Sequence, residues 1–459
     1  MSRFSPSELL ISLETRLALP HDAAVCIAFS GGLDSTVLLH ALARLATGQR
    51  GYRLRAAHVD HALHSDSARW REHCEQQARS LQVDLVTARV NVERVDELGL
   101  EAAAREARYG AFRQMLRPGE YLLSAHHADD QLETLLLALM RGAGVKGLGA
   151  MPAIQPFAAG WLGRPLLDYT RAELETWAAA EGLQWLSDPA NDNQALDRNF
   201  IRQRVVTSLR ERWPAAAHTA SRSAEHLQEA GRALEQLAAL DAENVAVSEC
   251  LNVERLRTLD PGRRRNLLRY WLRHRGARAP STRKLAAIEH DMLAAGADRV
   301  PCMGWDGWEI RRHRNLLYCE RQLPELPAQQ RLEWRVDAPL TLPAGLGRLL
   351  LVPSASPTHS NALSAAKLTG ALGVRFRVGG ESWQPAGDAF HRQLKKMLQA
   401  AAILPWWRDR VPLIYAGEQL LAVGDLWIAA DFAAREGEEA WAIVWENRPS
   451  IFALLPRCV

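Results

Sequence analysis

The segment VCIAFSGGLDS, residues 25–35, decides how the N-terminal part of the chain folds. Its first five residues are all apolar, which is typical of a parallel strand buried on both faces. After it, Val37, Leu38 and Leu42 recur at helical spacing, so a helix is expected over 35–46. The two glycines between the strand and the helix let backbone N–H groups close around phosphate oxygens, and the helix N-terminus adds its positive dipole. The segment therefore predicts a phosphate-binding turn.

Most of the polar side chains in this turn have a chemical use in such a site. The hydroxyls of Ser30 and Ser35 can hydrogen-bond to phosphate oxygens, and the carboxylate of Asp34 can hold Mg²⁺ on the phosphates. No Gly-Lys-Ser/Thr sequence is present here, which excludes the loop used to transfer a terminal phosphate. A plain strand-to-helix turn is the alternative, and the complete six-residue pattern favours nucleotide binding. The predicted nucleotide-binding residues are Ser30, Gly31, Gly32, Leu33, Asp34 and Ser35.

Strand and helix patterns alternate over the first two hundred residues. Strands separated by helices specify a parallel sheet with right-handed crossovers, and such sheets bind ligands beyond the carboxyl ends of their strands. The predicted fold class is therefore α/β, with an N-terminal Rossmann-like parallel-sheet domain. Further strands are expected at 54–60, 83–90 and 121–125, and helices at 65–81, 101–116, 129–141, 170–181 and 199–212.

The length of 459 residues corresponds to about three domains. Residues 1–214 form the predicted α/β domain, and a mainly helical domain is expected over 215–322, beginning with a long connecting helix at 215–245. After a Pro-rich linker, residues 331–459 read as short strands with one helix at 390–402, which predicts a small α+β domain.

Composition excludes several classes of protein. Hydrophobic residues make up 47% and charged residues 24%, which are ordinary globular values. The six cysteines are scattered without Cys-x-x-Cys spacing, which argues against a zinc site, an iron–sulfur cluster or a disulfide scaffold and fits a reducing cytoplasm. The first twenty residues carry Glu8 and Glu14 and predict an amphipathic helix instead of a signal peptide. No apolar run reaches the ~18 residues of a membrane span.

Basic residues are unevenly distributed although the net charge is only +3. Residues 262–283 contain eight Arg and no acidic residue, which for an isolated run indicates a solvated helix face. Several of the 15 Trp stand beside Arg, a pattern that is compatible with nucleic-acid binding.

Further motifs narrow the function. Together with SGGLDS they resemble the PP-loop ATP pyrophosphatases and, within these, the tRNA(Ile)-lysidine synthetase family, and the likeness spans nearly the whole chain. The motifs are HVDH at 58–61, EAAAREARY at 101–109, HHADDQLET at 126–134, RGAG at 141–144, RPLL at 164–167, DPAN at 188–191, RNFIR at 198–202, LKKMLQ at 394–399 and PWWRDR at 405–410.

The resemblance implies a ligase that uses ATP and Mg²⁺. Its substrate is an isoleucine tRNA with the anticodon CAU. ATP activates the oxygen at carbon 2 of the first anticodon cytosine, and the ε-amine of free L-lysine then displaces AMP to give lysidine, which changes codon reading from AUG to AUA. The HVDH motif places His58 and Asp60 among the expected nucleotide contacts. The oligomeric state stays open between a monomer and a homodimer.

The HHADDQLET motif supplies the other expected catalytic residues beside Asp34. Asp130 and Glu133 are three residues apart at a helix start, so both carboxylates lie on one face and can hold a lysine ammonium or Mg²⁺. Helix capping by Asp129 or Asp130 is the competing explanation, and the resemblance favours lysine for Asp130 and Glu133. His126 and His127 follow a strand at its carboxyl end and can contact ATP or act as acid or base. Which of the two does so is left open.

Arginine pairs on two predicted helices are candidate phosphate ligands. Arg105 and Arg108 share a face, where an ion pair with Glu101 and neutralisation of phosphates are equally supported explanations. Arg198 and Arg202, four residues apart, also share a face that suits phosphate.

The C-terminal motifs combine basic and aromatic residues. We expect the basic groups to bind tRNA phosphates, and Trp406 and Trp407 either to stack on bases or to pack in the core. The predicted tRNA-binding residues are Arg105, Arg108, Arg198, Arg202, Lys395, Lys396, Arg408 and Arg410.

Two other classes of function remain to be compared. Another PP-loop enzyme, such as a tRNA thiolase or a glutamine-dependent amidotransferase, needs a cysteine cluster or an N-terminal nucleophilic cysteine that the sequence lacks. A non-catalytic tRNA-binding protein would have no need for an intact Ser30–Ser35 loop.

Overall fold

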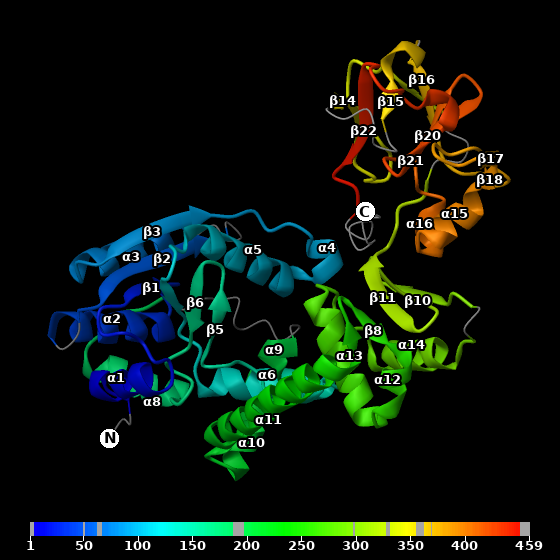
Figure 1. Cartoon of the computed structure of the whole chain (residues 1–459). Coiled ribbons are helices and arrows are strands. Elements are labelled where there is room, and N and C mark those ends of the chain that lie inside the picture. Colours follow the sequence, from blue (N-terminus) through cyan, green and yellow to red (C-terminus); the bar gives the residue numbers. More distant parts are fainter. Residues whose placement is uncertain are drawn as a thin grey trace. The chain divides into compact units, whose positions relative to one another are not determined.

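The computed structural model describes residues 4–48, 51–61, 67–186, 197–296, 299–326, 331–354, 362–368 and 370–449. The DPAN motif at 188–191 and part of the predicted linker lie outside these residues. The chain forms two compact units, Met1–Leu237 and Ala238–Val459 (Figure 1).

A six-stranded sheet lies at the centre of the first unit, in the order β3-β2-β1-β4-β6-β5. Five strands are parallel, which confirms the predicted fold class, and β5 forms an antiparallel hairpin with β6 that the sequence analysis did not predict. The strands are β1 (Ala24–Ala28), β2 (Arg53–Asp60), β3 (Asp84–Arg89), β4 (Tyr121–Leu123), β5 (Ile154–Phe157) and β6 (Gly160–Gly163).

Both faces of β1 are covered, as its apolar sequence predicts. Val25 and Ile27 point to one face and pack in the core that includes Leu38 of α2, whereas Cys26 points to the other face, in a cluster with Phe112 of α5. This alternation follows from the two-residue period of a strand. The helices around the sheet are α1 (Pro6–Thr15), α2 (Leu33–Gly48), α3 (Ser67–Ser80), α4 (Val95–Leu98), α5 (Leu100–Met115), α6 (Ala128–Met140), α7 (Val145–Leu148) and α8 (Arg171–Ala180).

The helix predicted at 199–212 is not a single regular helix. It consists of α9 (Asp197–Phe200), a π-helical segment, η2 (Ile201–Val206), and α10 (Thr207–Arg212). A π-helical turn adds residues per turn and is frequent at functional sites, and no sequence pattern announces it.

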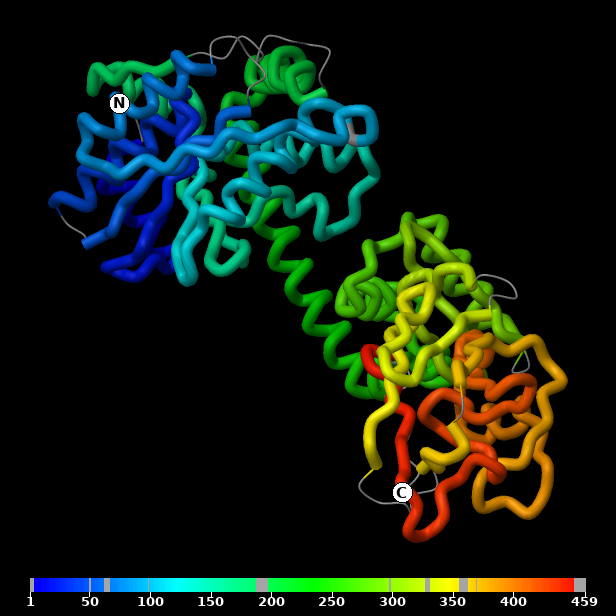
Figure 2. Tube along the Cα trace, turned by 90° about the horizontal axis from the view of Figure 1, so that it is seen from above, coloured from blue at the N-terminus to red at the C-terminus, as the bar shows by residue number. Residues whose placement is uncertain are grey.

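The long connecting helix is confirmed as α11 (Ala216–Val245), which Figure 2 shows in green. The division between the two compact units falls inside this helix. The predicted separation of the remainder into 215–322 and 331–459 stays a prediction.

The part of the second unit that was expected to be mainly helical also contains a five-stranded sheet, in the order β7-β8-β11-β10-β9. Leu251, Ile310 and Leu317 of the sheet are buried in one core with Leu268 and Ile288 of the helices. The elements are β7 (Ala246–Val247), β8 (Cys250–Asn252), β9 (Cys302–Trp305), β10 (Trp308–His313), β11 (Leu316–Arg321), α12 (Val253–Thr258), α13 (Pro261–His274) and α14 (Thr282–Ala294).

The C-terminal part is built from three small antiparallel sheets around one core. The helix predicted at 390–402 begins only at Leu394, because Arg392 and Gln393 pair with Trp383 and Ser382 as a short hairpin. The elements are β12 (Leu332–Trp334), β13 (Leu340–Thr341), β14 (Arg348–Pro353), β15 (Leu363–Ser364), η3 (Ala365–Lys367), β16 (Leu372–Arg375), β17 (Ser382–Trp383), β18 (Arg392–Gln393), α15 (Leu394–Ala400), α16 (Pro405–Arg408), β19 (Leu413–Ala416), β20 (Gln419–Val423), β21 (Trp427–Ile428), η4 (Ala430–Phe432) and β22 (Ala440–Glu446).

Candidate nucleotide and substrate site

The SGGLDS turn joins the carboxyl end of β1 to the start of α2, where the sequence places it. Gly31 has a φ of +81°, and a Cβ atom there would lie 2.9 Å from Sγ of Cys74, so only glycine fits. The backbone N–H of Ser30 donates to Oγ of Ser35 over 3.2 Å, and the two hydroxyl oxygens are 3.0 Å apart. The turn is therefore an internally hydrogen-bonded loop that holds the two hydroxyls side by side at the carboxyl end of β1.

The predicted nucleotide contacts His58 and Asp60 differ in their surroundings. His58 is buried on β2, and its Nδ1 lies 3.0 Å from the carbonyl oxygen of Phe29 and 3.5 Å from Sγ of Cys74. Burial lowers the pKa of His58, so the neutral ring supports the loop from behind. Asp60 is half-buried at the carboxyl end of β2.

The carboxylate of Asp34 connects the loop to α6 and α8. Its Oδ2 accepts a hydrogen bond of 3.2 Å from Nη1 of Arg171 and lies 3.7 Å from Nε2 of His127. Its Oδ1 is buried and has no hydrogen-bond partner among the described residues. Burial raises the pKa of Asp34 against the opposing effects of His127 and Arg171.

His127 also lies beside two carboxylates of the HHADDQLET motif. Its Nδ1 is 3.5 Å from Oδ2 of Asp129, and its Nε2 is 3.5 Å from Oδ2 of Asp130. The ring is buried, so one histidine bridges the predicted nucleotide loop and the start of α6.

Asp130 and Glu133 share one face of α6, as their spacing predicts, and that face meets Arg198 and Arg202. Nε of Arg198 donates to Glu133 over 2.8 Å, and Nε of Arg202 donates to Glu133 over 2.6 Å. Both arginines also reach Oδ1 of Asp130, at 3.1 and 3.2 Å. The two residues predicted to bind lysine and two of those predicted to bind tRNA therefore lie together. We call Asp130, Glu133, Arg198 and Arg202 the carboxylate–arginine cluster.

Asp130 has a capping role in addition to its ion pairs. Its Oδ2 accepts a hydrogen bond of 3.1 Å from the backbone N–H of His127. Burial raises its pKa, but His127 and the two arginines lower it further, so the pKa of Asp130 lies well below its usual range. The carboxylate is therefore ionised near neutral pH.

His126 occupies a different environment. Its Nδ1 lies 2.9 Å from Oγ of Ser124. Burial lowers the pKa of His126 to about 3, which keeps the ring neutral near pH 7.

Sequence reasoning missed three residues of this network. The backbone N–H of Arg171 donates to Oδ2 of Asp129 over 2.8 Å, and Arg210 pairs with Oδ1 of the same carboxylate. Two acids in succession, Asp129 and Asp130, were the available signal that more than one partner would be needed.

The arginines predicted on α5 contact other side chains. The guanidinium of Arg105 lies over the ring of Tyr109 at 4.9 Å, and Nε of Arg108 donates to Nε2 of His61 over 3.0 Å. Burial, together with Arg108, lowers the pKa of His61 to about 4, so this neutral ring can accept the hydrogen bond.

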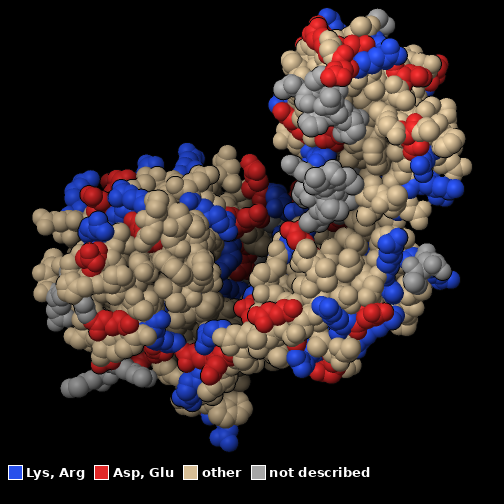
Figure 3. Space-filling view, viewed as in Figure 1, with Lys and Arg blue, Asp and Glu red and all other residues tan. Residues whose placement is uncertain are grey.

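The predicted C-terminal residues lie in the second unit. Lys395 and Lys396 are exposed on α15, where Figure 3 shows basic side chains, and Leu394 and Leu398 are buried beneath. Arg408 and Arg410 donate to the carbonyl oxygens of Ile403 and Pro324, over 2.8 and 2.6 Å.

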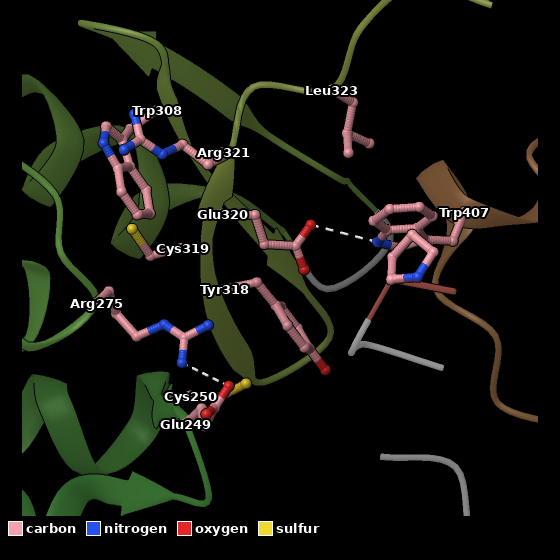
Figure 4. Close-up of a pocket in the computed structure, with 11 residues that line it drawn as sticks. Glu249, Cys250, Arg275, Trp308, Tyr318, Cys319, Glu320, Arg321, Leu323 and Trp407 are labelled. Carbon is pink, nitrogen blue, oxygen red and sulfur yellow. Dashed lines mark hydrogen bonds and ion pairs between the residues drawn. The ribbon is translucent and has the colours of Figure 1, made fainter. Parts of the chain in front are cut away.

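The surroundings of Trp406 and Trp407 distinguish the two explanations that the sequence left open, stacking on bases and packing in the core. Trp407 is buried, and its indole N–H donates to Oε2 of Glu320 over 3.3 Å (Figure 4). The indole N–H of Trp406 donates to the same oxygen over 3.2 Å. Packing is therefore the role that the structure gives this pair.

The described part of the chain shows neither a metal-binding cluster nor a membrane-spanning helix. No group of three or more His, Cys, Asp or Glu there is arranged to hold a metal ion, and the five cysteines it contains are free. None of the helices described combines the length and apolar character that crossing a bilayer requires.

Comparison with known proteins tests the resemblance. Family profiles described as the PP-loop domain, the TilS substrate binding domain and the TilS substrate C-terminal domain match residues 8–209, 251–318 and 372–445. The tRNA(Ile)-lysidine synthase of Coxiella burnetii is 40% identical over 96% of this chain and 96% of its own length. Its counterpart from Alkalilimnicola ehrlichii is 42% identical over 90% of this chain and 92% of its own length. The resemblance is thus confirmed, and the chain belongs to the tRNA(Ile)-lysidine synthase family.

Proposed function

We propose that this chain is a carbon–nitrogen ligase that attaches free L-lysine to carbon 2 of the first anticodon cytosine of an isoleucine tRNA with the anticodon CAU. The cytosine oxygen bonds to the α-phosphorus of ATP and pyrophosphate leaves. The ε-amine of lysine then bonds to carbon 2, and AMP leaves with that oxygen. Membership of the family over nearly the whole chain supports this reaction. Its substrates share the cytoplasm, which is where we place it.

The observation that carries the proposal is the SGGLDS loop. Gly31 has a left-handed φ and lies against Cys74, and the hydroxyls of Ser30 and Ser35 are fixed side by side at the carboxyl end of β1. Donors held in place before a ligand arrives stabilise the departing negative charge without reorganisation. The loop thus suits the pyrophosphate end of ATP.

Asp34 fits Mg²⁺ by the chemistry of its donor atoms. Carboxylate oxygens are the ligands that Mg²⁺ prefers, and Oδ1 of Asp34 is a buried acceptor without a hydrogen bond. When bound there, the ion supplies positive charge to the phosphates.

The carboxylate–arginine cluster supplies the site for lysine in this proposal. Asp130 and Glu133 hold a lysine ammonium, and Arg198 and Arg202 then turn from the carboxylates to phosphates. In this exchange one ammonium replaces two guanidinium groups at the two buried acids, and the freed guanidinium charges pair with phosphates. The short contacts of both arginines with Glu133 support it, since they show that this acid is built to hold nitrogen donors.

The two histidines have different parts. His126, with a pKa of about 3, is too weak a base to take a proton from an ammonium and serves as a neutral hydrogen-bonding group. His127 lies within 3.7 Å of Asp34 and 3.5 Å of Asp130, and so orients the nucleotide loop relative to the lysine site.

Mass spectrometry of tRNA nucleosides tests the proposal. Purified protein, ATP, Mg²⁺, lysine and a CAU isoleucine tRNA transcript should yield lysidine with equal amounts of AMP and pyrophosphate. With sound tRNA, failure to incorporate lysine rejects the function. Asp34→Ala separates the enzyme from a non-catalytic binder: the ligase loses pyrophosphate release and keeps its affinity for tRNA, whereas a binder has no pyrophosphate release to lose.

A further inference from the structure

Four arginines gather where the β10–β11 hairpin meets α16, inside the second unit. Arg311 and Arg314 come from the hairpin, and Arg408 and Arg410 come from α16 and the residues just after it. We call these four residues the arginine seam. Neither the charge run at 262–283 nor the family motifs include its hairpin half.

The two sides of the seam are fixed to each other. Glu320 of β11 accepts hydrogen bonds from the indoles of Trp406 and Trp407, the latter drawn in Figure 4. The guanidinium of Arg311 lies over the Trp406 ring at 5.2 Å, and the ring of Tyr318 meets Trp406 edge-on at 5.4 Å. A cavity of about 340 Å³ adjoins this contact (Figure 4). Trp406 is thus held by Arg311, Tyr318 and Glu320 and is not a free stacking platform.

Three of the four guanidinium groups lack an acidic partner. Within the residues that the structure describes, no carboxylate lies within ion-pair distance of Arg314, Arg408 or Arg410, whereas Arg311 is paired with Glu309 at 2.9 Å. Nη1 of Arg410 is buried and has no hydrogen-bond partner there. An unsatisfied buried donor on a cation is costly unless an acceptor completes it.

The like charges also oppose one another. Burial, Arg377 and Arg314 lower the pKa of Arg408, and Asp409 opposes them. Burial and Arg311 lower the pKa of Arg410 against the effects of Glu309 and Asp409. A set of cations that repel each other across a fixed contact binds an anion favourably, because the anion relieves the repulsion at every member.

We propose that the arginine seam binds a phosphate of the tRNA backbone, so that the RNA strand passes from the β10–β11 hairpin onto α16. The inference rests on the proposed function and extends it to Arg311 and Arg314. Guanidinium groups hold phosphate oxygens in bidentate fashion. The exposed Arg314 at the hairpin tip leaves the seam open to a polymer, in contrast to a closed pocket for a small anion.

Equilibrium binding of the full-length protein to the tRNA transcript at several salt concentrations tests the seam. Arg314→Ala and Arg408→Ala should each raise Kd roughly tenfold, as expected for a lost charge-assisted hydrogen bond to phosphate, and should lower the salt slope by about 1. Because both residues serve one phosphate, the double variant should lose less than the product of the two effects. The matched control is Arg335→Ala, an exposed arginine of the same unit that is already paired with Asp337, and it should leave Kd and slope unchanged.

Three outcomes overturn the inference. One is an Arg314→Ala variant that binds tRNA like the control. Another is a strictly multiplicative double variant. The third is that inorganic phosphate weakens tRNA binding equally in the wild type and in Arg314→Ala. In that case the arginine seam would make no contact with the RNA. Arg408→Lys keeps the positive charge but loses the bidentate geometry of the guanidinium group. Its Kd for tRNA should lie between those of the wild type and Arg408→Ala, and this intermediate value would exclude a folding defect as the cause. Wild-type protein that binds tRNA through the seam yet forms no lysidine would contradict the proposed function and leave the seam intact.

Discussion

Two arginine clusters, one in each unit, differ in how far acidic side chains neutralise them. In the first unit, Arg198 and Arg202 are each held by Glu133 and Asp130, so every charge in the carboxylate–arginine cluster has an opposite neighbour. In the second unit, Arg314 and Arg408 of the arginine seam have no acidic partner in the described structure. Neutralised charge suits a small cationic substrate that must be exchanged for another cation. Positive charge without an acidic partner suits the binding of a polyanion, whose affinity depends on the salt concentration.

The contrast predicts opposite stability effects. Removal of one partner from the carboxylate–arginine cluster leaves a buried charge with less compensation from opposite charges. Removal of an arginine from the arginine seam instead reduces the repulsion between like charges. Stability and function should therefore decline together in the first unit and separately in the second.

The largest effect is expected for Glu133→Ala. Arg198 and Arg202 would lose their closest partner, and since Arg202 is one third exposed and Asp130 remains, we expect a loss of about 2–4 kcal/mol in the free energy of unfolding. Lysine incorporation should disappear as well. Urea titration of the full chain measures the loss. The control is Glu235→Ala, which breaks an exposed pair with Lys146 and should change stability by less than about 1 kcal/mol. Equal losses of stability in the two variants would show that the ion pairs of Glu133 contribute no more than an exposed ion pair.

Next in size is Gly31→Ala in the nucleotide loop. The left-handed φ of +81° costs an alanine about 1–2 kcal/mol, and the new Cβ would lie 2.9 Å from Sγ of Cys74. ATP affinity should fall because the loop must shift, and tRNA affinity should not change. Isothermal titration with a non-hydrolysable ATP analogue measures the first and filter binding the second. The matched control, Gly48→Ala, has open space around its Cβ and should bind ATP as the wild type does. Retained ATP affinity in Gly31→Ala would remove the geometric basis of the proposed nucleotide site.

Local patterns were sufficient for the nucleotide loop. An apolar strand, two glycines and a helical repeat within residues 25–46 fix a turn whose neighbours in space are also neighbours in sequence. The same holds for the shared face of Asp130 and Glu133. What the spacing could not provide is the partner, because Arg198 lies 65 residues from Glu133, and nothing in either helix identifies the other.

The sheet of the second unit was missed for a different reason. Its β10–β11 turn carries Arg314 at a φ of +52°, where hairpins usually place glycine or asparagine, so the turn signal was hidden. The preceding turn does contain Asp306-Gly307, a strong hairpin signal that the run of arginines and tryptophans obscured. Trp406 and Trp407 could not be assigned without knowing that Glu320 lies opposite them.

Arg314→Gly sharpens the comparison further. Glycine tolerates the φ of +52° that strains arginine, and the substitution also removes one of the repelling charges. We expect Arg314→Gly to be at least as stable as Arg314→Ala, by about 0.5 kcal/mol, although both weaken tRNA binding. Thermal unfolding of the two variants side by side gives the difference. A glycine variant less stable than the alanine variant would show that the positive φ at residue 314 does not strain a side-chain-bearing residue there.

The smallest effect concerns the acid that holds the seam together. Burial raises the pKa of Glu320 above its usual 4.5, although the two indole hydrogen bonds oppose the shift. A folded-state pKa above the unfolded one means that the protonated carboxyl favours the folded state. This contribution is complete below pH 4.5 and is lost as pH rises through the raised value. Glu320→Gln keeps an acceptor for Trp406 and Trp407 and cannot ionise. Its melting temperature relative to wild type should therefore improve as pH rises from about 4.5. A constant difference across that range would show that Glu320 titrates alike in both states, and that the indoles compensate its burial in full.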